Sequence, residues 1–327
     1  MKILIIGAGG MIGSKLAKRI THDAQVANQA VKTLSLVDIV PHASPIATNN
    51  IVINTRVADL TKPDIADSLI DDEPDLIYQL AAVVSGEAEE NFDKGYLINL
   101  DGTRALLDAI RARHTATGYT PKVIFASSIA VYGAPFPEVI DDDFHLTPQT
   151  SYGTQKAICE LLLADFNRRG FLQGIGLRLP TICIRPGLPN KAASGFFSNI
   201  LREPLNGVSA VLPVNDQVKH WFASPRAAIN FLLHAASLPR DAIGLRCNMN
   251  LPGLCTTVAE ELEALQRVAG SDILKLIRHE PDATIQNIVA GWPESFTAER
   301  AIGLGFRSES SFDDIIKVYL EDDLPSR

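Results

Sequence analysis

A tyrosine and a lysine four residues apart, Tyr152 and Lys156, form the spacing in this chain best suited to chemistry. On a helix this spacing puts both side chains on one face. A phenol is a poor base at neutral pH. A neighbouring ammonium stabilises the phenolate and lowers its pKa, so the pair can remove a proton from a substrate hydroxyl. The spacing alone is also common on solvated helix faces, so it gains meaning only beside other signals.

Two serines, Ser127 and Ser128, provide such a signal. They end the short apolar run 122–127 (KVIFAS), which predicts a buried strand. Ligands bind at the carboxyl ends of strands in open α/β sheets, and a hydroxyl at that edge can orient a substrate oxygen. The alternative is a serine pair that merely caps a strand.

A glycine-rich turn, Gly7-Ala8-Gly9-Gly10-Met11-Ile12-Gly13, follows an apolar run and precedes a helical pattern. Glycines let such a turn close and let the backbone approach a pyrophosphate, while the helix N-terminus offers free N–H groups. The turn therefore predicts a dinucleotide site, with a purely structural turn as the alternative. The expected cofactor contacts in it are Gly7, Gly10, Met11, Ile12 and Gly13.

Asp38 ends the second apolar run, 33–37. A carboxylate there accepts hydrogen bonds from the adenosine ribose and repels a 2′-phosphate. The next residues, Ile39 and Val40, supply no arginine for such a phosphate. We therefore expect NAD rather than NADP, although an aspartate can also simply begin a loop.

The N-terminal half alternates strand and helix patterns, which predicts a doubly wound parallel sheet with helices on both faces, an α/β fold. Residues 41–50 read as a surface loop. The expected strands are 2–6, 33–37, 51–57, 74–80, 122–127 and a sixth that starts with 176–179, and the expected helices are 11–20, 89–113 and 151–169.

The pattern becomes irregular after residue 180 and predicts a smaller, mixed lobe. Ser224-Pro225 is typical of a helix start, and Thr257 with Glu260 has capping-box spacing. We expect an NAD-binding domain over 1–180 and a mainly substrate-binding lobe over 181–327, some segments of which return to the sheet.

Composition excludes several classes of protein. The 327 residues hold 30 Lys and Arg against 38 Asp and Glu, a net charge of −8, so nucleic acid and anionic membranes are not expected partners. The four cysteines lack metal spacing, and we expect buried free thiols and no metal site. No apolar run is long enough to cross a membrane and the N-terminus does not read as a signal peptide, which favours a cytoplasmic protein.

Together these motifs resemble the extended short-chain dehydrogenase/reductase family, in its epimerase/dehydratase-like branch. The resemblance implies a Rossmann domain, Tyr152 as the base, Ser128 as its partner, and Lys156 holding the nicotinamide ribose. One position departs from the pattern, because Gln79 stands where the family often has histidine. The resemblance also implies cofactor contacts from Asp59, Leu60, Leu80, Ala81, Ala82, Asn99, Tyr152, Lys156 and Pro180.

The family includes several reactions. Dehydratases carry an Asp-Glu pair directly after the catalytic serine or threonine, and Ile129-Ala130 stand there instead. A nucleotide-sugar epimerase needs no such pair and stays open, as do an L-threonine 3-dehydrogenase-like enzyme and, remotely, a non-catalytic NAD sensor. Few aromatic residues of the second half are placed to stack on a nucleotide base, which is weak counter-evidence to the epimerase.

Longer stretches look closest to the D-erythronate dehydrogenases of this branch. They are 79–87 (QLAAVVSGE), 147–156 (TPQTSYGTQK), 178–190 (RLPTICIRPGLPN) and 251–253. The resemblance implies NAD-dependent oxidation of the C2 hydroxyl of D-erythronate, a small anionic sugar acid, to 2-oxo-tetronate.

A small anionic acid needs hydroxyl donors and a cation. Arg185 can hold a carboxylate bidentately, while Arg178 reads as a structural ion-pair partner, and Arg202 and Arg226 as surface residues that could reach the pocket. The expected substrate contacts are Ser85, Ser127, Ser128, Tyr152, Thr181 and Arg185, with Asn190, Lys191 and Ser194 as weaker candidates.

The remaining signals read as structural. Trp221 and Trp292 fit core or interface packing better than a pocket wall, and Asp141-Asp142-Asp143 reads as a solvated loop. Family members commonly form homodimers through helices like those expected at 89–113 and 151–169, so we expect a homodimer by analogy alone.

Overall fold

The computed structural model describes residues 1–46, 50–187 and 194–324. The chain divides into two compact units, each assembled from three separate segments. Unit 1 holds 1–131, 150–178 and 229–249, and unit 2 holds 132–149, 179–228 and 250–327. Residues 229–249 of the C-terminal half therefore belong to unit 1.

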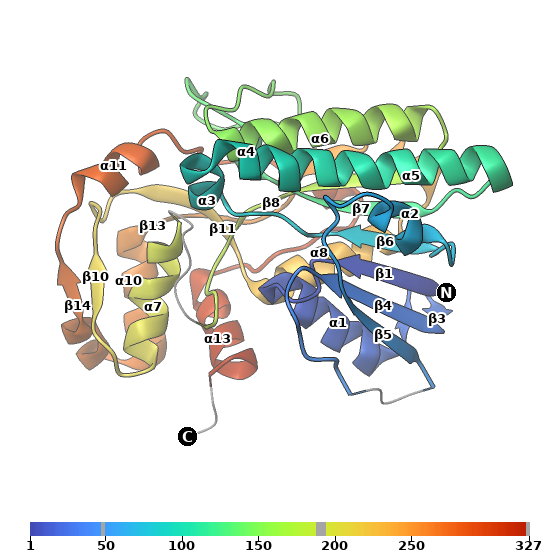
Figure 1. The fold of residues 1–327 in the computed structure, drawn as a ribbon. Helices are drawn as coiled ribbons and strands as arrows, with labels where there is room; N and C mark the ends of the chain where they lie inside the picture. Colours follow the sequence, from blue (N-terminus) through green and yellow to red (C-terminus); the bar gives the residue numbers. More distant parts are fainter. Residues whose placement is uncertain (47–49, 188–193, 325–327) are drawn as a thin grey trace. The chain divides into compact units, whose positions relative to one another are not determined.

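A seven-stranded sheet forms the centre of unit 1 (Figure 1). The pairs among β5, β4, β1, β6 and β7 are all parallel, which confirms the predicted doubly wound sheet. Strand order reverses between β1 and β6, the switch point where open α/β sheets bind ligands. In spatial order the strands are β12 (Asn248–Asn250), β8 (Gln173–Leu179), β7 (Lys122–Ser128), β6 (Leu76–Gln79), β1 (Lys2–Ile6), β4 (Thr33–Asp38) and β5 (Val52–Val57).

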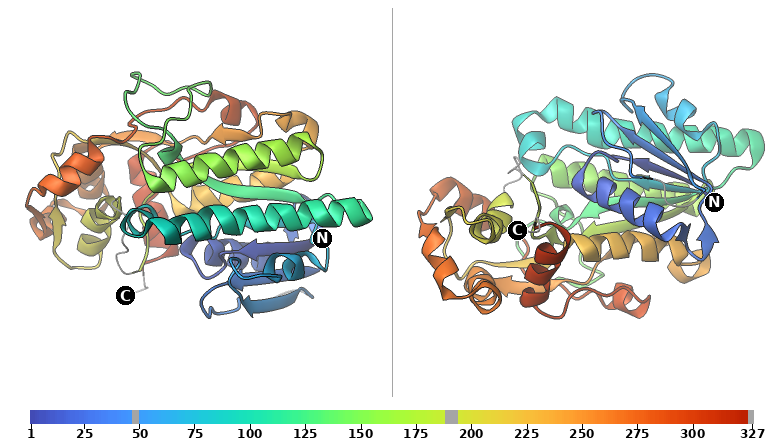
Figure 2. Two further views of the ribbon diagram at one scale, coloured as in Figure 1. Left: turned by 45° about the horizontal axis from the view of Figure 1, so that its top comes forward. Right: turned by 90° about the horizontal axis from the view of Figure 1, so that it is seen from below.

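Helices cover both faces of this sheet because its central strands are apolar on both sides. In β1, for example, Ile3–Ile6 are all buried. Helices α5 (Gly102–Thr117) and α6 (Ser151–Arg168) lie on one face, and α1 (Met11–Asp23) and α8 (Pro225–Ser237) lie on the other (Figure 2). The smaller elements of unit 1 are α2 (Ile65–Ile70), α9 (Arg240–Ile243) and a hairpin of β2 (Gln25–Val26) and β3 (Gln29–Ala30).

The single long helix expected over 89–113 is wrong. Asn91 leaves the helical region of backbone angles, and its side chain accepts a hydrogen bond from the Lys94 N–H and so caps a new helix. Asparagine favours this position. The segment is built from α3 (Ser85–Glu90), α4 (Phe92–Gly95), a π-helical turn (Tyr96–Asp101) and α5.

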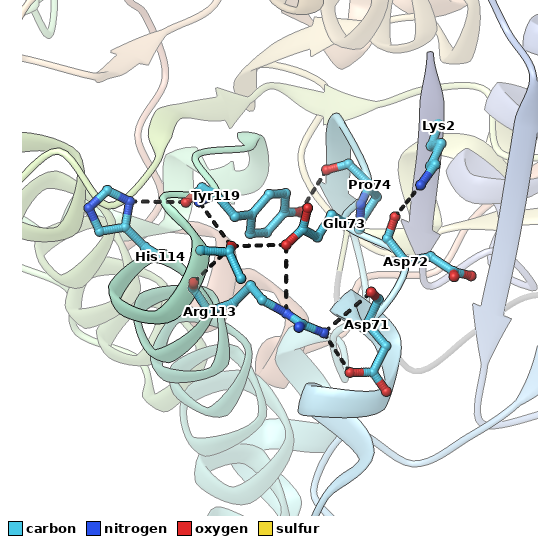
Figure 3. A network of polar contacts seen from close by, with 9 residues as sticks. Lys2, Asp71, Asp72, Glu73, Pro74, Arg113, His114 and Tyr119 are labelled. Carbon is cyan, nitrogen blue, oxygen red and sulfur yellow. Dashed lines mark hydrogen bonds and ion pairs between the residues drawn. The ribbon is translucent and has the colours of Figure 1, made fainter.

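A network of polar contacts lies near the amino-terminal ends of β6 and β7 (Figure 3). Arg113 of α5 donates to the backbone carbonyl and to the carboxylate of Asp71, at 3.3 and 2.7 Å. The Tyr119 hydroxyl donates to the Pro74 carbonyl at 2.6 Å. The Arg113 and Asp71 side chains are 28% and 69% exposed, so water screens this pair.

Unit 2 has its own core. Phe197, Phe222 and Ile316 are fully buried within it. The predicted capping box is confirmed, because Thr257 and Glu260 cap α10 reciprocally, and Ser224 accepts from the Ala227 N–H at the start of α8. Its elements are β9 (Thr181–Ile182), α7 (Gly195–Leu205), β10 (Ala210–Leu212), β11 (Lys219–Ala223), β13 (Leu254–Thr257), α10 (Val258–Ala269), a 3-10 turn (Ser271–Leu276), β14 (Ile277–His279), α11 (Ala283–Val289), α12 (Glu299–Gly303) and α13 (Phe312–Asp322).

Two expectations about single residues are corrected in unit 2. Arg202 is buried rather than at the surface, since it pairs with Glu203 and donates to the Arg185 carbonyl. Cys255 is exposed, unlike the other three cysteines. The expected core packing of Trp292 is confirmed by its contact with the Phe197 ring, and Trp292 also lines a pocket of about 470 Å³ together with Cys255.

Within the described ranges, no helix combines the length and apolar character that a membrane span requires.

Candidate active site

The glycine turn lies at the switch point of the sheet, against the loop that follows β6. Gly7 has a φ of +94°, which disfavours any side chain. A Cβ on Gly7 would lie 2.6 Å from the Ala81 nitrogen, and one on Gly13 would lie 2.1 Å from the Gly7 carbonyl oxygen. Both positions therefore require glycine, and the turn brings Gly7 and Ala81 together.

Helix α1 begins directly behind this turn, with Gly10 as its N-cap and no side chain capping it. Met11, Ile12 and Gly13 thus offer the free N–H groups of a helix N-terminus. Asp38, at the end of β4, accepts a hydrogen bond from the Gly9 N–H at 2.8 Å. The predicted ribose acceptor therefore lies beside the predicted phosphate cradle.

Two further predicted cofactor contacts, Asp59 and Leu60, follow β5. Burial raises the pKa of the Asp59 carboxyl, but hydrogen bonds from Thr61 and the charge of Lys62 outweigh burial and lower it overall. Leu60 would be 3.6 Å from a Cβ on Gly102 of α5, so its side chain packs at the start of that helix.

Asn99 fixes the loop after β6 from the π-helical turn. Its Oδ1 accepts from the Val83 N–H at 2.9 Å, and its Nδ2 donates to the Val83 carbonyl at 3.2 Å. The loop 80–84, with Leu80, Ala81 and Ala82, is partly exposed while Asn99 is buried. Gln79, in the family's histidine position, donates to Thr103 at 3.1 Å.

These residues fit a dinucleotide. The crowded glycines, the uncapped helix N-terminus and the carboxylate of Asp38 occur together at one edge of the sheet, where β1, β4 and β6 end. This combination suits a pyrophosphate on backbone N–H groups and a ribose on a carboxylate.

Tyr152 and Lys156 share one face of α6. The Lys156 Nζ lies 5.7 Å from the centre of the Tyr152 ring and 4.7 Å from that of Phe125, and donates to the Ala126 carbonyl at 2.8 Å. Burial lowers the pKa of Lys156 to about 8, against the opposing influence of Cys159 and Glu160. The ammonium therefore predominates only below about that pH.

Three residues that sequence reasoning missed place the start of α6. Thr150 caps it by accepting from the Gly153 N–H at 3.0 Å, and Glu89 of α3 accepts from the Ser151 N–H at 3.0 Å. A Cβ on Gly153 would lie 2.1 Å from the Ala130 carbonyl oxygen. Glycine beside Tyr152 thus lets α6 approach the turn that follows Ser128.

Ser127 and Ser128 have different surroundings, since consecutive strand residues face opposite sides. Ser127 is buried and donates to Glu160 at 2.6 Å, and Glu160 in turn pairs with Arg178 at 2.7 Å. Ser128 is partly exposed and its Oγ accepts from the Ala130 N–H at 3.1 Å. Arg178 is confirmed as an ion-pair partner within its strand.

Ser85 begins α3, which packs against α6, so it belongs to the same unit as Ser128, Tyr152 and Lys156. Nothing in the sequence indicated that Glu160 is the partner of Arg178. The glycine at position 153, between Tyr152 and Lys156, was a visible signal that α6 approaches a neighbouring backbone closely.

The remaining predicted contacts belong to unit 2. Thr181 lies 2.6 Å from the Nε2 of His220, and burial lowers the pKa of that imidazole to about 3. Arg185 donates to the Ile182 carbonyl at 3.0 Å and to the Ser194 hydroxyl at 2.9 Å. Pro180 is buried between β8 and β9, and Asn190 and Lys191 lie outside the described residues.

Comparison with known proteins identifies similar families and structures. The model of the NAD dependent epimerase/dehydratase family matches residues 3–221. A D-erythronate dehydrogenase of Cupriavidus necator is 45% identical over 326 residues, covering 98% of each chain. One of Haemophilus influenzae is 43% identical over 330 residues, covering 99% of this chain and all of its own.

A solved structure carries a different description. The crystal structure of a nucleoside-diphosphate-sugar epimerase from Agrobacterium tumefaciens matches with a TM-score of 0.95 and 55% identity, covering 98% of this chain and 94% of the other. An L-threonine dehydrogenase from Cupriavidus necator matches with a TM-score of 0.84 at 22% identity, which supports the fold alone.

Proposed function

The chain belongs to the NAD dependent epimerase/dehydratase family, and from that premise we propose that it oxidises the C2 hydroxyl of D-erythronate to 2-oxo-tetronate. The observation that carries the proposal is the similarity to two D-erythronate dehydrogenases over nearly the full length of all three chains. The family and its NAD dependence confirm what the motifs predicted. The substrate and the residue roles are our proposal.

The residues around the glycine turn would hold NAD. Gly7, Gly10 and Gly13 admit the pyrophosphate, and Asp38 accepts from the adenosine ribose. Asn99 holds the loop 80–84 through two hydrogen bonds with the backbone of Val83. NAD, when bound, supplies the acceptor for the hydride of the substrate.

Tyr152 acts as the general base on the C2 hydroxyl, and Ser128 orients the same oxygen. Lys156 supports the phenolate, since its ammonium lies on the same face of α6. Ser128 is the better candidate of the two serines, because the Ser127 hydroxyl is engaged by Glu160.

The substrate's remaining polar groups need donors. Ser85 belongs to the same unit as the proposed catalytic residues, and Thr181 and Arg185 are the candidates from unit 2. The Arg185 guanidinium already donates to Ile182 and Ser194, so it is a fixed cation. A fixed guanidinium suits a carboxylate.

The decisive assay follows NADH formation by purified protein. NAD would be offered with D-erythronate, L-threonate, L-threonine and UDP-glucose in parallel. Turnover on D-erythronate alone supports the proposal. Turnover on L-threonine alone, or on none of the four, contradicts it.

Replacing Tyr152 by phenylalanine tests the proposed base. We expect Tyr152→Phe to lower kcat by about 100-fold to 10,000-fold with nearly unchanged NAD affinity. Tyr119→Phe, at the opposite edge of the sheet, is the matched control. Full activity in Tyr152→Phe would remove this residue from the mechanism.

The preference for NAD tests Asp38. Asp38→Ala should relax discrimination against NADP, because the carboxylate no longer repels the 2′-phosphate. An unchanged ratio of kcat/KM for the two cofactors would assign the preference to another residue.

An epimerase acting on a nucleotide sugar is the second candidate, favoured by the description of the Agrobacterium tumefaciens structure. It would give no net NADH, so the assay above would be silent. Chromatography of UDP-glucose after incubation with the protein would then reveal the epimer.

A homodimer is also part of our proposal. Leu161 of α6 is 67% exposed, and Phe92 and Leu97 near α4 are exposed as well, which suits burial against a second copy. Light scattering should give twice the mass of one chain, and Leu161→Glu should reduce it. A wild-type mass of one chain contradicts this part. The cytoplasmic location stays a prediction.

A further inference from the structure

One face of α6 holds the end of β7 at two consecutive residues. The Lys156 Nζ donates to the Ala126 carbonyl at 2.8 Å. One helical turn further, the Glu160 carboxylate accepts from the Ser127 hydroxyl at 2.6 Å. Because Ser127 and Ser128 face opposite sides of the strand, anchoring Ser127 also fixes the direction in which Ser128 points.

Glu160 is itself firmly held. It is 1% exposed, and Arg178 of β8 donates to both of its oxygens, through Nε at 3.0 and 3.1 Å and through Nη2 at 2.7 Å. A bidentate guanidinium fixes the geometry of a carboxylate. Glu160 therefore joins α6, β7 and β8 below the exposed end of the sheet.

Glu160 is also the nearby charge that favours the ammonium form of Lys156. Burial lowers the pKa of Lys156, and Cys159 and Glu160 act against this. Burial raises the pKa of the Cys159 thiol to about 11, so at neutral pH that thiol is uncharged.

The other described groups in contact with Lys156 lie on β7 and α6. On β7 they are the Phe125 ring and the Ala126 carbonyl, and on α6 the Tyr152 ring. Arg178, on β8, carries a positive charge and pairs with Glu160 at 2.7 Å.

We propose that Glu160 is a positioning residue for this reaction: through Ser127 it fixes the end of β7 that presents Ser128, and through its charge it keeps Lys156 an ammonium. The inference rests on the proposed roles of Ser128 and Lys156. In this proposal the buried Glu160–Arg178 pair positions Ser128 and Lys156 without contacting substrate or cofactor.

The first experiment measures the ionisation of Lys156 directly. In cofactor-free protein with 13Cε-labelled lysine, the NMR titration of Lys156 is assigned with Lys156→Met. We expect Glu160→Gln to lower the titration midpoint by about one pH unit. An unchanged midpoint would overturn the electrostatic half of the proposal, whatever the substrate proves to be.

Ser127→Ala is the matched variant, since it removes the link to β7 and keeps the Glu160–Arg178 pair. We expect about a 10-fold loss of kcat, because Ser128 is less well directed, with an unchanged Lys156 titration and NAD affinity. Wild-type kcat in Ser127→Ala would overturn the positioning half.

Glu160→Gln removes the carboxylate that pairs with the buried Arg178 guanidinium, so this variant can fail to fold. Glu160→Gln with Arg178→Gln removes both charges and keeps amides that can hydrogen-bond. In that variant we expect the Lys156 midpoint to fall again, by less than in the single variant because the Arg178 cation is also gone. A midpoint equal to that of the wild type would contradict the proposal.

The kinetic arm separates this inference from the proposed function. If Lys156→Met retains full activity on D-erythronate, the proposed role of Lys156 fails while the titration result stands. If Lys156→Met is inactive, the alkaline limb of kcat against pH should move to lower pH in Glu160→Gln and not in Ser127→Ala.

Discussion

Two glutamates, one in each unit, are almost fully buried. They differ in whether their carboxyl oxygens have hydrogen-bond partners. Glu160 on α6 is 1% exposed and is bound by Arg178 and Ser127. Glu261 on α10 is 0% exposed, and neither of its oxygens has a hydrogen-bond partner among the described residues.

The core of unit 2 explains the state of Glu261. Its neighbours on α10, Val258, Ala264 and Leu265, all belong to that core. Burial raises the pKa of the Glu261 carboxyl well above its ordinary value. An unpaired buried carboxyl gives up its charge, because desolvation is not compensated.

Burial alone therefore does not decide whether a carboxyl is useful as a charge. Glu160 is held by a guanidinium and a hydroxyl and can orient a strand, while Glu261 costs stability whichever form it takes. Four substitutions test this difference.

Arg178→Met should be the most damaging. It strands the Glu160 carboxylate in the interior, and losing one partner of a buried pair costs about 3–5 kcal/mol. Urea unfolding followed by circular dichroism measures the loss. If Arg178→Met lowers the free energy of unfolding by less than about 1 kcal/mol, the Glu160–Arg178 pair contributes no more than an exposed ion pair does. The contrast between Glu160 and Glu261 would then not hold.

Glu261→Leu should have the opposite sign. Removing an unsatisfied carboxyl from an apolar core should stabilise the protein by about 1–3 kcal/mol. Glu263→Leu on the same helix, where the side chain is 66% exposed, is the control and should change little. A clear destabilisation by Glu261→Leu would mean that this carboxyl has a structural role.

The pH dependence of Glu261→Gln sharpens the same contrast. The folded carboxyl keeps its proton well above the ordinary value of 4.5, so above that pH the folded state holds a proton that the unfolded state has lost. This contribution to stability is complete below the ordinary value and is lost as pH rises through the folded value. The unfolding free energy of Glu261→Gln minus that of the wild type should therefore grow as pH rises above about 5. A constant difference would contradict the raised pKa.

Arg113→Ala should have the smallest effect. It removes an ion pair of the network in Figure 3, where both partners are partly or fully exposed. We expect a loss below about 1 kcal/mol, reduced further by salt. A loss equal to that of Arg178→Met would show that burial does not set the scale.

Sequence patterns predicted what depends on local spacing. The strand ending at Ser127-Ser128, the helix bearing Tyr152 and Lys156, and the capping box at Thr257 are all confirmed. Each is encoded by hydrophobic period or by a cap within a few residues of the feature itself.

What the sequence did not predict depends on partners far apart in the chain. Arg178 was expected to form an ion pair, but Glu160 lies 18 residues earlier, and nothing local marks it. The break at Asn91 went unseen inside a continuous helical pattern, and Arg202 was placed at the surface because its buried acceptors cannot be identified from spacing.

The division of each unit into three chain segments has a consequence for synthesis. Unit 1 is completed by residues 229–249, and the last strand of its sheet, β12, is Asn248–Asn250. Lys122 of β7 donates to the carbonyls of Ala236 and Leu238. A nascent chain emerging from the ribosome therefore exposes one edge of β8 until three quarters of the residues have been made. Chains stalled before that point present an unpaired strand edge, a template for aggregation, so a slow ribosome or a missing chaperone should reduce the yield of this protein more than its final stability suggests.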